Sequence, residues 1–251
     1  MVDEALLAVP IGLAIGLLLG LVGGGGSILA VPALVYGLGQ DVKTATTTSL
    51  LVVGATALAG SLAHARGGHV GWRCALVFSA IGGLGSFAGT ALNRSLDGQV
   101  ILILFALVLL AAAAAMLHYR PPNESRPRAS WLKVVPVALG VGALTGFFGV
   151  GGGFLIVPAL VVLIGMPMEL AVGTSLLVIA LTCAVALSAH LASGDVEWPV
   201  AATMTASAVG GAVAGSRLGG QVPQERLRQG FAGLVVGIAL FLLVKNGDAV
   251  V

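Results

Sequence analysis

Charged residues are scarce in this sequence: Asp, Glu, Lys and Arg together make up 9% of its 251 residues. A soluble globular domain carries about a quarter charged residues, so the composition excludes an ordinary water-exposed surface. Hydrophobic residues make up 58%, and the mean hydropathy is +1.07. Apolar runs of about 20 residues recur, the length that crosses a hydrocarbon core about 30 Å thick. The sequence therefore predicts one all-α polytopic membrane protein.

Features that indicate other protein classes are missing. The net charge of +2 comes from residues between the apolar runs, where they set membrane orientation and do not favour a nucleic-acid partner. Solid apolar runs exclude the weak alternation of a membrane β-barrel. The acidic start MVDEALL lacks the basic region of a signal peptide, so we expect residue 1 to belong to the mature protein. Cys74 and Cys183 lie far apart in apolar surroundings, where we expect buried thiols.

Catalytic and metal-binding patterns are also missing. The four histidines show no ligand spacing, and GLVGGGGS lacks the lysine of a phosphate-binding loop. We therefore expect no cofactor, no bound metal and no enzymatic activity. No Lys, Arg, Asp or Glu lies deep in an apolar run; Asp41, Lys43 and Glu169 stand at the edges, where solvated charges are expected.

An internal repeat organises the chain. A shift of 126 residues places GLVGGGGSILAVPALV (20–35) on GFFGVGGGFLIVPALV (146–161). The alignment runs without a gap to residue 72, with 23 of 53 positions identical from residue 20 onward. The polar, Pro-containing stretch between the halves is typical of an exposed loop. We expect a first repeat at 1–117, a loop at 118–131 and a second repeat at 132–251.

Each half contains four hydrophobic blocks, and the first block is too long for one crossing. Residues 5–39 carry no charge over 35 positions, which as one helix would extend about 52 Å. The glycines Gly23 to Gly26 leave a second piece of 13 residues, about 20 Å as helix and too short to cross comfortably. We expect a split or re-entrant helix, a hairpin that turns inside the membrane or the protein. The other blocks are expected at 44–64, 72–92 and 100–118, and at 132–165, 170–190, 198–216 and 229–244.

The basic residues test this hairpin, because Lys and Arg concentrate on the cytoplasmic side. They divide 7 to 5 if each first block crosses once, and 9 to 3 if it enters and leaves on one side. The stronger bias favours the hairpin and places both termini outside. Each half then has an odd number of net crossings, so the repeats are inverted, as in many secondary transporters. Parallel repeats remain the alternative.

The glycine runs are candidate anion sites. Backbone N–H groups at a helix start lack intrahelical partners and lie at the positive end of the helix dipole. Glycine also lets a ligand approach the backbone closely. The residues expected to bind an anion in this way are Gly23, Gly25, Gly26, Ser27, Gly149, Gly151, Gly152 and Gly153. Close helix packing is the alternative, and it is the role expected for Gly82, Gly83, Gly85 and Gly89.

Hydroxyl residues recur one hairpin after the glycines. TTTSL (46–50) aligns with VGTSL (172–176), and hydroxyls at a helix start either cap the backbone or coordinate an anion or small cation. We expect the two segments to converge on the same pocket. The residues concerned are Thr48, Ser49, Thr174 and Ser175.

His64 and His190 also align, each a few residues before a tryptophan. An imidazole can carry protons in a transport cycle, which makes both residues candidates for a proton carrier or a gate. Anchoring at the membrane interface is the simpler role, and it is the one expected for Trp72 and Trp198.

The duplicated pattern resembles the TauE/SafE (TSUP) family of sulfite and sulfonate exporter-like permeases. The shared elements are GxxGxGGGxxxVPxL, GTSL and an AH…G.V.W segment, and the second half is the closer match. The first half departs with Thr46-Thr47 before Thr48 and with Ser27 at the end of its glycine run, so the half-sites are unequal. The resemblance implies a bacterial inner-membrane transporter of small sulfur-containing or organic anions.

A secondary transporter of a small oxyanion, sulfite or a sulfonate, is the leading hypothesis. Without embedded acids, coupling could come from a proton on the substrate, from Na⁺ at backbone carbonyls, or from no ion. A passive anion channel is the first alternative, and a membrane enzyme or non-transporting subunit is the second. A homo-oligomer is compatible with the sequence.

Overall fold

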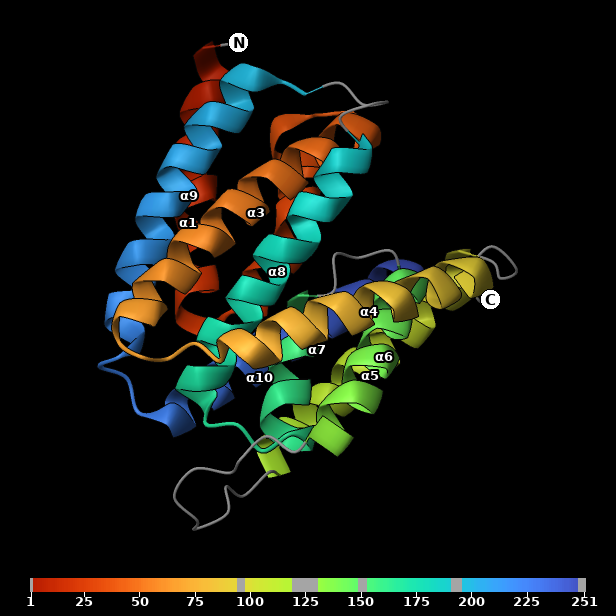
Figure 1. The fold of residues 1–251 in the computed structure, drawn as a ribbon. Helices are drawn as coiled ribbons and strands as arrows, with labels where there is room; N and C mark the ends of the chain where they lie inside the picture. Colours follow the sequence, from red (N-terminus) through yellow and green to blue (C-terminus); the bar gives the residue numbers. More distant parts are fainter. Residues whose placement is uncertain (1, 94–97, 119–130, 149–152, 191–195, 248–251) are drawn as a thin grey trace.

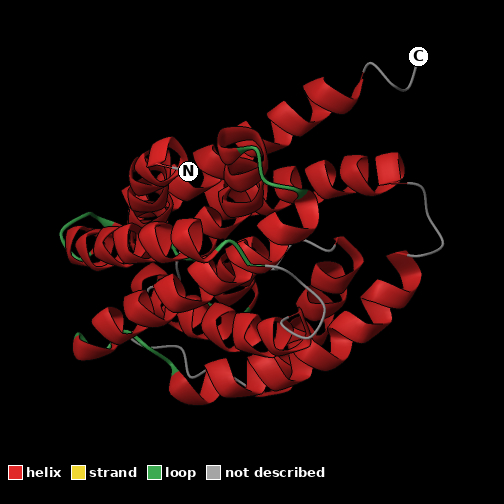
Figure 2. Cartoon of the chain, turned by 90° about the horizontal axis from the view of Figure 1, so that it is seen from above, coloured by secondary structure: helices red, strands yellow, loops and turns green. Residues whose placement is uncertain are grey.

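The structure is a computed structural model that describes residues 2–93, 98–118, 131–148, 153–190 and 196–247. Within these residues all regular elements are helical (Figure 2). The first half contains α1 (Val2–Val22), the 3₁₀ turn η1 (Gly24–Gly26), α2 (Ser27–Pro32), the π-helical turn η2 (Ala33–Gly37), α3 (Val42–Arg66), α4 (Trp72–Asn93) and α5 (Gly98–His118). The second half contains α6 (Trp131–Phe148), α7 (Gly153–Pro158), the π-helical turn η3 (Ala159–Leu163), α8 (Met168–His190), α9 (Trp198–Gly219) and α10 (Gln224–Gly247). The predicted all-helical fold is confirmed.

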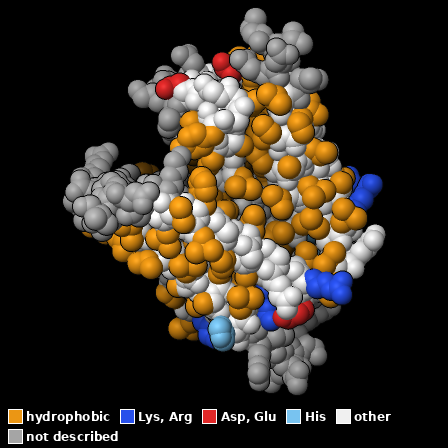
Figure 3. All heavy atoms as spheres, turned by 180° about the vertical axis from the view of Figure 1, so that it is seen from behind, with side chains coloured by type: hydrophobic (Ala, Val, Ile, Leu, Met, Phe, Trp, Pro, Cys, Tyr) orange, Lys and Arg blue, Asp and Glu red, His pale blue; other side chains and the backbone are white. Residues whose placement is uncertain are grey.

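The helices follow the predicted hydrophobic blocks. Among the described residues, Thr44–Arg66 in α3 and Met168–Leu187 in α8 are long and apolar enough to cross a membrane by themselves. Large apolar side chains are exposed on the outside, including Leu132 (88% exposed), Phe87 (79%) and Val244 (74%). Figure 3 shows such side chains over most of one face, with charged side chains toward its ends and margin. Water disfavours so continuous an apolar surface, whereas lipid suits it.

The chain reverses direction at the glycine run of the first half. Gly23 has a φ of +76°, in the region where side chains cause strain. A Cβ on Gly26 would lie 2.8 Å from the carbonyl oxygen of Ile15 and 2.8 Å from Leu19 Cγ. A straight helix would hold residues 15 and 26 about 16 Å apart. The chain has therefore folded back on α1, which is the hairpin that the length of block 5–39 predicted for this half.

Each broken segment continues into a π-helical turn directly after a proline. Pro32 ends α2 before η2, and Pro158 ends α7 before η3. Proline lacks an N–H group and its ring crowds the preceding turn. The regular i to i+4 pattern is lost there, which favours the wider π turn.

Helices α3 and α8 lie side by side and run in opposite directions (Figure 1). A Cβ on Gly54 would lie 3.0 Å from Cys183 Cβ, and a Cβ on Gly60 would lie 3.2 Å from Leu176 Cδ1. Rising residue numbers in α3 thus meet falling numbers in α8. Since α3 and α8 occupy equivalent places in the sequence repeat, this one pair of equivalent helices is antiparallel.

Two other helix pairs each join one helix of the first half to one of the second: α1 packs on α9, and α4 packs on α6. A Cβ on Gly16 of α1 would overlap the carbonyl group of Ala208. A Cβ on Gly142 of α6 would overlap that of Gly82. Gly142 and Ala208 each follow their counterpart, Gly16 and Gly82, by 126 residues. Positions related by the repeat therefore make the same contact with the halves exchanged.

The scattered glycines of α4 have the packing role predicted for them, with one exception. Gly85 and Gly89 lie against the backbones of Leu139 and Ala143, and a Cβ on Gly82 would lie 3.4 Å from the carbonyl oxygen of Ala138. Nothing lies within 4 Å of a Cβ placed on Gly83. Small residues thus allow the α4 and α6 backbones to touch.

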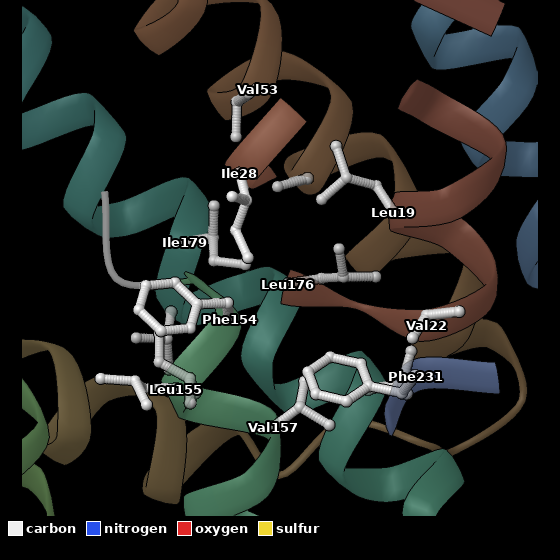
Figure 4. Close-up of a cluster of buried hydrophobic side chains, with 14 of the residues drawn as sticks. Leu19, Val22, Ile28, Val53, Phe154, Leu155, Val157, Leu176, Ile179 and Phe231 are labelled. Atoms are coloured by element: carbon white, nitrogen blue, oxygen red, sulfur yellow. The ribbon is translucent and has the colours of Figure 1, made fainter. Parts of the chain in front are cut away.

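A cluster of buried apolar side chains lies where the broken segments meet (Figure 4). They come from both halves: Leu19, Val22, Ile28 and Val53 from the first, and Phe154, Leu155, Val157, Leu176, Ile179 and Phe231 from the second. Cys74 and Cys183 are buried free thiols, as predicted. The two tryptophans expected at membrane interfaces, Trp72 and Trp198, are exposed.

Candidate functional site

The broken segments of the two halves cross in direct contact. A Cβ on Gly24 would overlap the carbonyl group of Gly153, so only glycine fits at that point. A Cβ on Gly153 would lie 2.6 Å from Ser27 Oγ. That hydroxyl donates a hydrogen bond to the carbonyl oxygen of Gly24 (2.7 Å). The Ser27 side chain therefore occupies the space that Gly153 leaves.

The same glycine run meets the hydroxyl segment of the second half. A Cβ on Gly23 would lie 2.7 Å from Ser175 Oγ and 3.4 Å from Val172 Cα. Ser175 is buried, and its hydroxyl donates to the carbonyl oxygen of Val172 (2.8 Å). The structure thus brings together Gly23 and Ser175, one residue from each of the two predicted segments.

The other predicted glycines are not all at this contact. A Cβ on Gly25 would lie 2.9 Å from Leu234 Cδ2 of α10, and Gly26 faces α1. Their surroundings are those of closely packed small residues. Gly149, Gly151 and Gly152 lie outside the described residues. Gly24, which is not among the predicted site residues, makes the closest backbone contact.

The buried polar side chains of the described residues are seven hydroxyls, one amide and one imidazole. They are Gln40, Thr47, Thr48, Ser49, Thr56, Ser61, His64, Thr174 and Ser175. Carboxylates and basic chains are missing from this buried set. Charge inside the protein would therefore be met by hydroxyls and backbone dipoles, as the sequence predicted.

Thr48 and Thr174, equivalent in the repeat, differ in hydrogen bonding. Thr174 Oγ1 accepts from the N–H of Gly71 (2.9 Å) and donates to the carbonyl oxygen of Leu170 (2.6 Å). Thr48 is fully buried, and its Oγ1 has no hydrogen-bond partner within the described part of the chain. The neighbouring Ser49 donates to the carbonyl oxygen of Thr46 (2.8 Å). Such a buried hydroxyl costs about 1–3 kcal/mol unless something else satisfies it.

His64 is buried at one end of the α3–α8 pair. Its Nε2 lies 3.1 Å from the carbonyl oxygen of Gly20, near the end of α1. It lines a pocket with Leu21, His69, Glu169, Val172, Ser216, Gly219, Gly220 and Leu227. No cluster suited to a metal ion is found among the described residues. His190 is the last residue of α8, and its side chain is outside the described part of the structure.

Sequence reasoning missed one pair in this pocket. His69 Nε2 lies 3.3 Å from Glu169 Oε2, with 43% and 30% of the two side chains exposed. The sequence predicts a solvated edge charge at Glu169 and assigns no role to His69. Neither belongs to a local motif, so only the folded chain brings them together.

An all-helical chain with a lipid-facing surface and two broken segments crossing at its centre has the architecture of a multi-pass membrane transport protein. The comparisons with known proteins assign it more closely. The chain belongs to the sulfite exporter TauE/SafE family, whose profile matches residues 8–242. This confirms the resemblance seen in the duplicated motifs and makes the protein a membrane transporter rather than an enzyme.

Relatives match along nearly the whole chain. A probable membrane transporter protein of Xylella fastidiosa (strain 9a5c) is 35% identical over 100% of this chain and 99% of its own length. YunE of Bacillus subtilis, a probable membrane transporter protein, is 32% identical over 86% of this chain and 88% of its own. A probable membrane transporter protein of Methanocaldococcus jannaschii is 28% identical over 96% and 97%. No solved structure matches the chain.

Proposed function

We propose that this protein is a secondary transporter that moves a small sulfur-containing or organic anion, such as sulfite or a sulfonate, across the inner membrane. The anion binds where the glycine breaks meet the Thr/Ser helix starts. The neutral buried polar set supports this location, because a carboxylate there would repel an anion. The breaks add backbone N–H groups at helix starts.

The unpaired hydroxyl of Thr48 is the observation that carries this proposal. The sequence motif selects Thr48 as a ligand, and its Oγ1 is buried without a partner in the described residues. A hydroxyl donates one hydrogen bond, and an anion oxygen accepts it. The hydroxyl of its equivalent, Thr174, is already hydrogen-bonded to the backbone of Gly71 and Leu170. Thr48 therefore binds substrate, while Thr174 positions the opposite half-site.

The two repeats, 1–117 and 132–251, have inverted orientations in this proposal, with both termini outside. The antiparallel contact of α3 with α8 supports inversion, since parallel repeats would align equivalent helices in one direction. The exchanged pairs α1–α9 and α4–α6 support a two-fold relation. Inverted repeats allow the central site to face each side of the membrane in turn.

Substitution of Thr48 tests the site. Thr48→Val in proteoliposomes should lower sulfite or sulfonate flux about tenfold, the effect of losing a hydrogen bond to a charged group. Thermal stability should be unchanged or higher, because valine removes an unsatisfied hydroxyl. Thr48→Ser keeps the donor and should retain most of the flux. Full flux in Thr48→Val would place the anion elsewhere.

The passive channel makes a different prediction for the same vesicles. An ion-coupled secondary transporter accumulates substrate against its gradient when the gradient of its coupling ion is imposed. A channel only lets the gradient collapse. Uphill sulfite or sulfonate movement driven by a proton or Na⁺ gradient therefore supports the transporter.

A further inference from the structure

The loop between α3 and α4 is fastened to the start of α8 by three contacts. His69 pairs with Glu169 (Nε2 to Oε2, 3.3 Å), and the Gly71 N–H donates to Thr174 Oγ1 (2.9 Å). A Cβ on Gly173 would overlap the carbonyl oxygen of His69, so the loop lies directly on that glycine. This junction ties the first half to the second at the mouth of the pocket that His64 lines.

The start of α8, which contacts the α3–α4 loop, also contacts the crossing of the broken segments. Val172 and Ser175 both lie against Gly23, and both follow Glu169 within two turns of α8. On the α1 side, His64 bonds to Gly20, three residues before Gly23. Any movement of the α3–α4 loop away from α8 therefore changes contacts next to the proposed anion site.

The opposite end of the α3–α8 pair has a counterpart with different chemistry. Gln40 Nε2 donates to Glu197 Oε2 (2.7 Å), and Gln40 is buried. Gln40 and Glu197 are equivalent by the 126-residue shift to Met166 and Gly71, which also touch, with a Cβ on Gly71 3.8 Å from Met166 Cε. Both ends thus join the two halves, but through different positions of the repeat, since His69 and Glu169 are equivalent to Asp195 and Lys43. One end uses a histidine–carboxylate pair, and the other uses an amide–carboxylate pair.

We propose that these two links are the latches of two gates, and that only the His69–Glu169 latch is operated by protons. This rests on the proposed alternating-access transporter. Protonation adds one proton to the His69 imidazole and turns its contact with the Glu169 carboxylate into an ion pair. Histidine changes charge at about pH 5–8, whereas an amide does not titrate. Acid on that side therefore holds the gate closed, and rising pH releases it.

Apart from His64, the pocket lining contains no titratable residue besides His69 and Glu169. Among the pocket-lining residues, the titratable groups are His64 and His69 from the α3 side and Glu169 from α8. The linings from α1, α9 and α10 are Leu21, Ser216, Gly219, Gly220 and Leu227. The pocket lining does not include the charged residues near the ends of α3, α4, α9 and α10, which are Arg66, Arg73, Arg217, Glu225, Arg226 and Arg228. Arg228 is bound to Glu225 (2.7 Å). Glu169 is thus the carboxylate that faces His69.

Spin-label distances test the latch without any substrate, so the result is independent of whether sulfite or a sulfonate is carried. Labels at Leu62→Cys in the last turns of α3 and at Pro167→Cys just before α8, in a Cys74→Ala, Cys183→Ala background, report the distance between these two segments. From about pH 5.5 to about pH 8.5 the open, long-distance population should rise relative to the closed one. The expected change in ratio is about two- to fivefold, the range for a partly exposed ion pair.

Variants separate the latch from a general effect of pH. His69→Gln and Glu169→Gln should each make the distance distribution independent of pH. Gly173→Ala pushes the loop away from α8 without substituting either His69 or Glu169. It should therefore increase the open, long-distance population at both pH values. Gln40→Leu, the matched control at the other end, should leave the pH response intact. A pH response that survives in both His69→Gln and Glu169→Gln, or is absent from the unmodified latch, overturns the proposal.

Discussion

Ser27 and Gly153 hold equivalent positions in the repeat, yet only one of them carries a side chain. They meet at the crossing, where a Cβ on Gly153 would lie 2.6 Å from Ser27 Oγ. One hydroxymethyl group fits there and two do not. Ser27 fills the space at the crossing, and the glycine at position 153 leaves room for it.

Exchange of the two residues tests this complementarity. Gly153→Ser alone should lower the free energy of unfolding by about 1–3 kcal/mol, the cost of overpacking a filled site. The double variant Ser27→Gly/Gly153→Ser should recover part of that loss, because the hydroxymethyl group then comes from the other side. Thermal unfolding of detergent-purified protein gives the double-mutant cycle. Strictly additive effects would show that the two residues do not share the space.

Sequence comparison between the halves found some of these residues and missed others. Ser27 was recognised as a departure from the glycine run, and Thr48 was recognised by its motif. Gly24 does not stand out in a comparison of the halves, because its counterpart is Val150. The His69–Glu169 pair was missed because its members lie in different halves. A contact between unrelated positions leaves no mark in local spacing.

Helix α6 offers a controlled test of packing at the scale of an element. Gly142 would place a Cβ in the backbone of Gly82 on α4, whereas nothing lies within 4 Å of a Cβ on Gly140. Gly140→Ala should be neutral or stabilising by up to about 1 kcal/mol, because alanine favours helix. Gly142→Ala carries the same propensity gain but separates α6 from α4, so it should be destabilising.

Thermal unfolding and the yield of monodisperse protein measure both alanine variants. The comparison cancels helix propensity, since the two sites lie in one helix two residues apart. Equal stability of the two variants would mean that the α4–α6 contact is loose. That result would also weaken the equivalent α1–α9 contact at Gly16.

The helical elements were predictable because bilayer thickness fixes their length and turns interrupt their apolar runs. The glycine hairpin was predictable because block 5–39 is too long for one crossing. The packing of α1 on α9 and of α6 on α4, each across the two halves, was not predictable from the sequence. Helices of similar composition can pair in several ways in lipid, and backbone contacts through small residues decide among them. The π turns after Pro32 and Pro158 are likewise local responses that hydropathy does not register.

The whole molecule combines a symmetric frame with unequal functional groups. The helix pairs repeat under the 126-residue shift, but Thr48 differs from Thr174 in hydrogen bonding and the two ends carry different latches. A symmetric frame gives both sides access to one central site. Unequal latches allow the two sides to respond differently to protons.

Membrane orientation is the property of the whole chain on which alternating access depends. Asp41 and Pro167 are equivalent by the repeat, and both are exposed after a broken segment. Inverted repeats place them on opposite sides of the membrane, whereas parallel repeats place them on the same side. With the 9-to-3 division of basic residues, Asp41→Cys should react with an impermeant maleimide in intact cells. Pro167→Cys should react only after permeabilisation. Reaction of both under the same condition would require parallel repeats, and the two latches could not then face opposite sides.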